Sequence, residues 1–277
     1  MTKAIDLLNL LRETVVPGGI ILRALQGKLD NRPKESDLPD DLADDKSTAH
    51  TIGDDLVQEV ALQILSSHST DFRINAEEDT PRVNTFSGTD SSFCYHLDPL
   101  DGTLSFIQGS DGYAVGAAFS RNKQFEASAI YFPARDKVYL AQRGKGIRVE
   151  TQFRQELPFD RINPTSGKYI QRRAEKYVPV VESMNFTHLD TMGAHHGMVC
   201  IARGEARVLM YGRASPHDFG IPQVVVEESG GICTDSEGNP VTYEKGFPRV
   251  PLFMAFSDIE TKEAFFESDV YASLDTK

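Results

Sequence analysis

The stretch Phe93-Cys-Tyr-His-Leu-Asp-Pro-Leu-Asp-Gly-Thr103 decides how this chain is organised. Its first five residues are mostly apolar and predict a buried strand. The proline disfavours a helical conformation at Asp98, so the strand is expected to enter a tight turn. A helix should begin near Gly102. The turn then presents two carboxylates, Asp98 and Asp101, on one side, and the carbonyl of Leu100 faces the same pocket.

Two interpretations of these aspartates are open from the residues alone. Aspartates beside a turn often cap the following helix. Convergent carboxylates also hold hard cations such as Mg²⁺, which prefer oxygen ligands and share them with a substrate phosphate. A helix starting at Gly102 would offer free amides to a phosphoryl group. Thr103 lies where it can contact a water molecule, and Glu77 is the nearest upstream acid that could accept its proton.

Upstream, residues 5–26 carry apolar side chains at helical spacing, interrupted by Pro17-Gly18-Gly19. We expect two helical pieces there, or one bent helix. Residues 28–46 lack periodicity and predict an exposed, mobile loop. A helix is predicted from Thr51, with two aspartates in its first turn. A short strand over residues 73–78 would deliver an acidic pair.

Downstream, three strand-like segments predict an antiparallel meander with a hairpin turn at residues 121–123. A boundary between two halves is expected in the charged stretch 150–176, which gives an N-terminal half 1–150 and a C-terminal half 151–277. The predicted meander strands cover residues 114–120, 125–132 and 137–141. The later elements are strands at 178–181 and 207–211, and helices at 195–203, 218–229 and 258–267.

The composition excludes several classes of protein. A net charge of −12 argues against a nucleic-acid or anionic-membrane surface, since either needs a basic face. The same charge favours bound cations, which would reverse the local field for an anionic substrate. Three cysteines, distant and odd in number, fit reduced thiols in a core. Without a signal-peptide core or a stretch of roughly 20 apolar residues, a cytoplasmic protein is expected.

Three motifs resemble the inositol monophosphatase-like family of magnesium-dependent, lithium-sensitive sugar and nucleotide phosphatases. They are Asp98-Pro-Leu-Asp-Gly-Thr103, Ala76-Glu77-Glu78, and His217-Asp218 followed by Glu227-Glu-Ser-Gly-Gly231. The resemblance extends from about Thr51 to Gly231. It implies a layered α-β-α-β-α sugar-phosphatase fold, with a mainly antiparallel N-terminal sheet and a smaller C-terminal sheet.

The resemblance also implies the roles of the site residues. Glu77, Asp98 and the Leu100 carbonyl would hold one Mg²⁺. A second ion would be held by Asp98, Asp101 and Asp218, and Asp54 with Glu77 would help with a weaker third. Gly102 and Thr103 would bind the phosphate, and a water oriented by Thr103 and Glu77 would attack phosphorus in line. The implied substrate contacts are Asp101, Gly193, Ala194 and His195.

The sequence departs from the family pattern on the substrate side. Residues Tyr211-Gly212-Arg213 fall near the position of the family's inositol-binding glutamate. Gly193-Ala194-His195 stands where the family has a glycine followed by two small residues. Ala76 and His217 replace the usual glycine and tryptophan, but the carboxylates remain. The resemblance therefore implies the family's hydrolytic chemistry but does not identify the substrate.

The expected function is hydrolysis of a phosphate ester on a small polyol, sugar or nucleotide. Activities of the 3′(2′),5′-bisphosphate nucleotidase and fructose-1,6-bisphosphatase types are alternatives. From another class, the chain could be a non-catalytic protein that binds a phosphorylated metabolite and regulates a partner. The complete set of carboxylates favours the enzyme, and the resemblance suggests a homodimer.

Overall fold

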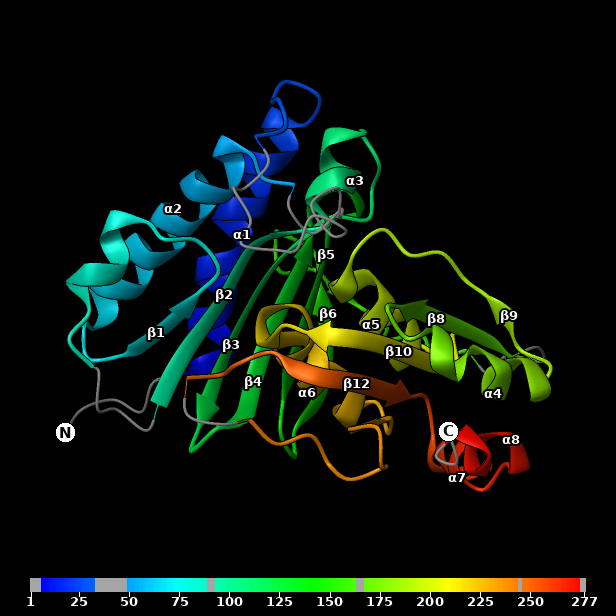
Figure 1. Cartoon of the computed structure of the whole chain (residues 1–277). Helices are drawn as coiled ribbons and strands as arrows, with labels where there is room; N and C mark the ends of the chain where they lie inside the picture. Colours follow the sequence, from blue (N-terminus) through cyan, green and yellow to red (C-terminus); the bar gives the residue numbers. More distant parts are fainter. Residues whose placement is uncertain (1–5, 33–48, 89–92, 163–166, 244–245, 275–277) are drawn as a thin grey trace.

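Two β-sheets and the helices packed on them form five layers, in the order helix, sheet, helix, sheet, helix (Figure 1). Clusters of buried apolar side chains lie between these layers. The predicted layered α/β fold is thereby confirmed. Within the 277-residue chain, the computed structural model describes residues 6–32, 49–88, 93–162, 167–243 and 246–274.

The first layer consists of α1 (Leu7–Leu25) and α2 (Ile52–His68), which lie together on one face of the larger sheet (Figure 1). The helix predicted from Thr51 is confirmed as α2. Thr51 is its N-cap, and the Thr51 hydroxyl and the carboxylate of Asp54 form a capping box. Asp54 and Asp55 occupy the first turn, where the helix dipole favours negative charge.

α1 is one continuous helix that includes Pro17, so of the two expected arrangements the single helix is present and the two separate pieces are not. The two glycines that follow allow very close packing. A Cβ atom on Gly18 would lie 2.5 Å from the Val57 side chain, and one on Gly19 would lie 2.2 Å from the Tyr131 ring. Contacts with α2 and with the sheet therefore stabilise the helix across a sequence that would break it in isolation.

The larger sheet has seven strands in sequence order. Its first two strands pair parallel and all other neighbours pair antiparallel, so the mainly antiparallel sheet and its meander are confirmed. Asn122 and Lys123 have φ angles of 49° and 69°, as expected of a tight hairpin turn. The strands are β1 (Arg73–Ala76), β2 (Phe93–Asp101), β3 (Ala114–Arg121), β4 (Gln124–Phe132), β5 (Lys137–Gln142), β6 (Gly146–Glu150) and β7 (Glu156–Leu157).

The middle layer holds α5 (Ala194–Ala202) and α6 (Ile221–Glu228), which lie between the two sheets (Figure 1). Both helices were predicted, although the start of the second is a separate π-helical turn, η6 (Pro216–Gly220). Gly230 has a φ of 88° and follows the end of α6. Glycine is favoured there because the left-handed conformation that closes a helix strains other residues.

The smaller sheet has five strands in the order β11-β12-β10-β8-β9. Three short helices cover its outer face. One of them, α4, lies where a strand was predicted. Residues 178–181 were expected to form a strand but lie in α4, where Val180 and Val181 are fully buried. Helical packing of these two valines prevails over the strand preference of β-branched residues. The strands are β8 (Lys168–Arg172), β9 (Thr187–His188), β10 (Val208–Ala214), β11 (Ile232–Thr234) and β12 (Val250–Phe256).

The remaining elements are short. The outer helices are α4 (Val178–Ser183), α7 (Ile259–Phe266) and α8 (Asp269–Ala272). The helix predicted at 258–267 is thus α7, capped by Asp258. The other helical turns are α3 (Thr103–Ile107), η3 (Pro81–Thr85), η4 (Pro133–Arg135) and η5 (Glu175–Tyr177).

The predicted loop at 28–46 lies mostly outside the described residues. The division into halves 1–150 and 151–277 stays a prediction; the larger sheet ends with β7 and the smaller one begins with β8. Cys94, Cys200 and Cys233 are buried free thiols, as expected. In the described part of the chain, no helix is long and apolar enough to cross a membrane.

A buried ion pair joins the first helical layer to the far edge of the larger sheet. The Arg12 guanidinium of α1 donates to the carboxylate of Glu150 on β6, and the side chains are only 8% and 4% exposed. Arg12 also donates to the carbonyl of Gln152 at 2.6 Å. Arg148 approaches the same carboxylate at 3.2 Å from the solvent side, with 44% of its side chain exposed.

We expect Arg12→Met to lower the free energy of unfolding by about 3 kcal/mol, because it leaves the buried Glu150 carboxylate without its main partner. Arg148→Met serves as the matched control and should cost less than about 1 kcal/mol, since an exposed ion pair contributes little. Urea unfolding followed by circular dichroism measures both. Equal losses in the two variants would contradict the assignment of the buried pair.

Candidate metal centre

The centre is built where β2 ends. The pairing of β2 with β3 shifts register between Asp98 and Asp101, so an irregularity in the strand lies between the two carboxylates. The Leu100 amide donates to the Asp98 carboxylate at 3.1 Å. Gly102 has a φ of 76°, and a Cβ there would lie 2.9 Å from the Met192 carbonyl oxygen. The predicted strand and helix are present, but β2 continues through Pro99 to Asp101, where a tight turn was expected. Only Gly102 forms a turn before α3, and only glycine fits it without strain.

Carboxylates from two distant segments converge on this turn. Asp98, Asp101 and Asp218 each place one oxygen within 4.8 Å of the other two. Asp218 comes from η6, at the start of the middle helical layer. Glu77, directly after β1, lines the same cavity of about 1060 Å³. Of the other predicted site residues, the lining includes Leu100, Gly102, Thr103, Gly193 and Ala194.

Asp101 joins the larger sheet to the middle layer. Its two oxygens accept hydrogen bonds from the backbone amides of Ala194 at 2.8 Å and His195 at 3.0 Å, at the start of α5. A Cβ on Gly193 would lie 2.3 Å from one of these oxygens. The glycine therefore permits a contact between backbone and carboxylate that any other residue would block.

Thr103 connects the centre to α2. Its hydroxyl lies 3.0 Å from the Leu100 carbonyl oxygen and 3.4 Å from an Asp54 carboxylate oxygen. The other Asp54 oxygen accepts from the Thr51 amide and hydroxyl, both at 2.8 Å. Asp54 thus stands behind Thr103 and is not among the residues that line the cavity. Burial, against these hydrogen bonds from Thr51, raises the pKa of Asp54 to about 6.

Burial and mutual repulsion make these carboxylates hard to ionise together. Burial, reinforced by the charges of Glu77 and Asp101, raises the pKa of Asp218 to about 7. The same causes raise the pKa of Asp98 well above its ordinary value, and burial raises that of Asp101. Several oxygen donors that repel one another in a dry site fit a hard divalent cation, which would favour their ionised forms.

The side chain of His195 faces away from the cavity. It is fully buried, and a Cβ on Gly116 would lie 2.1 Å from its ring. Its Nε2 atom lies 3.0 Å from the His217 carbonyl oxygen and 3.8 Å from Asp98. The structure thus brings the His195 amide into the centre, through Asp101, and packs its imidazole behind it. The predicted contact of His195 with substrate stays a prediction.

A polar network that the sequence did not predict lies behind the carboxylates. The Asn75 amide group contacts His96 Nδ1 at 3.1 Å, and its carbonyl oxygen contacts His217 Nε2 at 3.1 Å. His96 Nε2 in turn lies 2.7 Å from the Ser120 hydroxyl. One set of neutral tautomers satisfies every member, and burial lowers the pKa of His96 well below its usual range. The network ties the turn that carries Asp218 to the strand before Glu77.

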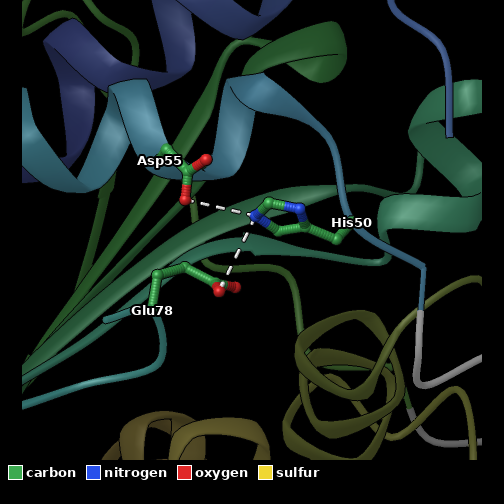
Figure 2. A group of neighbouring side chains, drawn as sticks. All are labelled: His50, Asp55 and Glu78. Carbon is green, nitrogen blue, oxygen red and sulfur yellow. Dashed lines mark hydrogen bonds and ion pairs between the residues drawn. The ribbon is translucent and has the colours of Figure 1, made fainter. Parts of the chain in front are cut away.

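A second group of ionisable side chains includes Asp55 and Glu78, the sequence neighbours of Asp54 and Glu77. Figure 2 shows His50 between Asp55 and Glu78. The His50 Nε2 atom is 3.2 Å from Asp55 and 3.7 Å from Glu78. These atoms are close enough to share a cation, and a protonated imidazole accounts for the same geometry. The sequence did not predict a role for His50, because a single histidine before a helix is common.

Five alternating layers around a buried cluster of carboxylates define a class of α/β proteins suited to holding divalent cations. The chain belongs to the inositol monophosphatase family, whose profile matches residues 12–255. It is similar to a putative Nus factor SuhB from Neisseria meningitidis serogroup B, with 29% identity over 160 residues, 54% of this chain and 60% of that protein. An inositol-1-monophosphatase from Rhizobium meliloti is 27% identical over 175 residues, 57% of this chain and 63% of that protein.

A solved structure supports the same fold. The IMPase from Thermotoga maritima matches with a TM-score of 0.73 and 18% identity, over 95% of this chain and 96% of that one. The alignments with the two curated relatives span about 60% of the length of those proteins.

The carboxylates predict how stability depends on pH and metal. Because folding raises the pKa of Asp54 to about 6 and of Asp218 to about 7, protonation stabilises the folded state. That contribution is complete below about pH 4, the unfolded pKa, and is lost as the pH rises through 6 to 7. In EDTA, the melting temperature should therefore fall between pH 5 and 8 by on the order of 5 °C.

The comparison with Asp218→Asn isolates the effect, because this variant lacks one of the two groups and its melting temperature should fall less. Added MgCl₂ should raise the melting temperature of the wild type more at pH 8 than at pH 5, since the cation binds ionised carboxylates. Differential scanning fluorimetry measures all of these. A wild-type profile parallel to that of Asp218→Asn would contradict the assigned repulsion.

Proposed function

We propose that the protein is a magnesium-dependent phosphomonoesterase that hydrolyses a small phosphorylated polyol, sugar or nucleotide. The observation that carries the proposal is the convergence of Asp98, Asp101 and Asp218 on the cavity that Glu77 and Thr103 also line. Membership of the inositol monophosphatase family supports it. The names of the relatives, one a phosphatase and one a putative Nus factor, leave the substrate to be identified.

The proposed ligands are those that the family resemblance implies, and Asp98, Asp101 and Asp218 are close enough to share an ion. Glu77, Asp98 and the Leu100 carbonyl would hold one Mg²⁺; Asp98, Asp101 and Asp218 would hold a second. Asp54 and Glu77 would serve a weaker third ion. When bound, the ions supply Lewis-acid stabilisation of the phosphate and of the leaving oxygen.

The other residues orient the reactants. The Thr103 hydroxyl lies next to both the Leu100 carbonyl and Asp54, so it can direct a water molecule toward phosphorus. Glu77 accepts the proton of that water. The backbone amides of Gly102 and Thr103 hold the phosphate as it is attacked. Asp101 and the segment Gly193-Ala194 face the alcohol part of the substrate, while the α5 amides keep the Asp101 carboxylate in place.

A non-catalytic protein that binds a phosphorylated metabolite is the alternative from another class. Glu77, Asp98, Asp101, Asp218 and Thr103 all line one cavity, which favours the enzyme, because a binding protein has no need to maintain all of them. Inhibition by lithium, a homodimer and a cytoplasmic location belong to the same proposal and rest on family membership.

Asp98→Asn is expected to reduce magnesium-dependent phosphate release by about 10³-fold or more, because Asp98 would contact both ions. Asp111→Asn provides the control, since this aspartate is 58% exposed and paired with Arg135. Phosphate release is measured over inositol phosphates, sugar phosphates and bisphosphates, and 3′,5′-nucleotides, with and without lithium, and circular dichroism verifies the fold.

Turnover in Asp98→Asn equal to that of the wild type would contradict the metal assignment. Binding of a phosphorylated metabolite by the wild type without hydrolysis of any ester would support the regulatory alternative instead.

A further inference from the structure

His217, which directly precedes Asp218, stands where the family pattern has a tryptophan. Its Nε2 atom lies 3.1 Å from both the side-chain oxygen and the backbone carbonyl oxygen of Asn75 on β1. Its own backbone carbonyl oxygen lies 3.0 Å from His195 Nε2 in the first turn of α5. The peptide before Asp218 is therefore held from two sides, by the larger sheet and by the middle helical layer.

The Asn75 amide group fixes the direction of the hydrogen bonds on both of its sides. Its oxygen can only accept, so His217 Nε2 donates to it. Its nitrogen can only donate, so His96 Nδ1 accepts from it at 3.1 Å. His96 Nε2 then donates to the Ser120 hydroxyl at 2.7 Å. One chain of hydrogen bonds thus runs from η6 through β1 and β2 to β3.

Each of the three central members of this chain is a near neighbour, in the sequence, of a carboxylate of the candidate metal centre. The neighbouring pairs are His217 with Asp218, Asn75 with Glu77, and His96 with Asp98. Asn75 and His96 are partners in the register of β1 and β2, and the Glu77 amide continues this pairing by donating to the Leu97 carbonyl at 3.1 Å. Residues two apart on a strand project to the same face of the sheet. The chain is therefore a second row of side chains on the same three segments that carry the carboxylates.

We propose that Asn75 is a positioning residue, which acts through His217 and His96 to hold the three carboxylate segments at the spacing that a divalent cation requires. This inference rests on the metal centre of the proposed function and adds a residue behind it. Ionised carboxylates repel one another, so contacts behind them must keep them together for an ion to bind. Hydrogen-bonded partners of metal ligands commonly have this role. The chain joins Asp218, which comes from the middle layer, to the two strands of the larger sheet.

Calorimetric titration of the full chain with MgCl₂ at pH 8 tests the inference. Asn75→Leu removes both hydrogen bonds of the amide and keeps a side chain of similar size. The Kd for Mg²⁺ should rise by about 10-fold, which is the lower end of the effect of removing direct partners of metal ligands.

Two substitutions of His217 separate the hydrogen bond from the packing of the ring. In His217→Gln, the amide nitrogen can still donate toward Asn75, so this variant should keep the wild-type Kd. His217→Leu cannot donate and should raise the Kd as Asn75→Leu does. Equal Kd values in His217→Gln and His217→Leu would overturn the inference, because the hydrogen bond would then have no effect on the ion.

Gln223→Met is the matched control for a general loss of stability. Gln223 is 5% exposed and accepts from the Tyr243 hydroxyl at 2.8 Å, and neither residue is among the described residues that line the cavity. This variant should lower the melting temperature in EDTA and keep the wild-type Kd. If Asn75→Leu behaves in the same way, with a lower melting temperature and an unchanged Kd, Asn75 only stabilises the fold and the inference is overturned.

Failure of the proposed function has a different signature. A wild type that binds Mg²⁺ but hydrolyses no phosphate ester would contradict the phosphatase, while the comparison of Kd values would still decide the role of Asn75. A wild type that binds no Mg²⁺ would overturn the positioning role together with the metal assignment.

Discussion

The repulsion among buried carboxylates is the constraint on which the rest of the structure depends. Burial raises the pKa of Asp98 and of Asp218, and the nearby charges of Glu77 and Asp101 raise both further. Such a cluster is costly in a dry interior unless protons or cations balance it. The fold meets part of this cost with backbone amides on Asp101 and with hydroxyl and amide donors on Asp54. The part left over would favour a bound divalent cation.

Glycines make this concentration of charge possible at close range. Gly193 lets α5 approach the Asp101 carboxylate, and Gly116 accommodates the ring of His195 behind Asp98. Gly102 closes the turn against the Met192 segment. At these glycines, atoms of a neighbouring layer occupy the space that a side chain would otherwise fill. Precision in the site is therefore a property of the packing between the sheets as much as of the acids themselves.

Local sequence patterns predicted the elements whose folding is decided locally. Gly102 marks the turn after β2, and the apolar runs of β3 and β4 on either side of the turn at Asn122 and Lys123 predict the meander. Tertiary contacts decide the elements that the local sequence left open or predicted wrongly. α1 remains continuous through Pro17 because its glycines pack against α2 and the sheet, and Val180 and Val181 are helical because they are buried that way.

The residues of the candidate site that belong to sequence motifs were predicted. The residues that only the strand order brings together were not. Arg172, at the end of β8, and Arg249, just before β12, both line the cavity but are 77 residues apart in the chain, and nothing in their local sequences marks them. The Asn75 network and the His50 group are equally dispersed. Charged residues on strand ends are common, so only the strand order shows that these face one cavity.

The Asp101 contact with α5 has a consequence for the motions of the protein. The proposed ligand Asp218 follows β10 of the smaller sheet, and the amides that hold Asp101 come from the helix packed on that sheet. Local opening of the smaller sheet would therefore dismantle the site while the meander stayed intact. A bound cation would slow that opening, so amide hydrogen exchange in β10 and α5 would report on occupancy of a site mostly carried by β2.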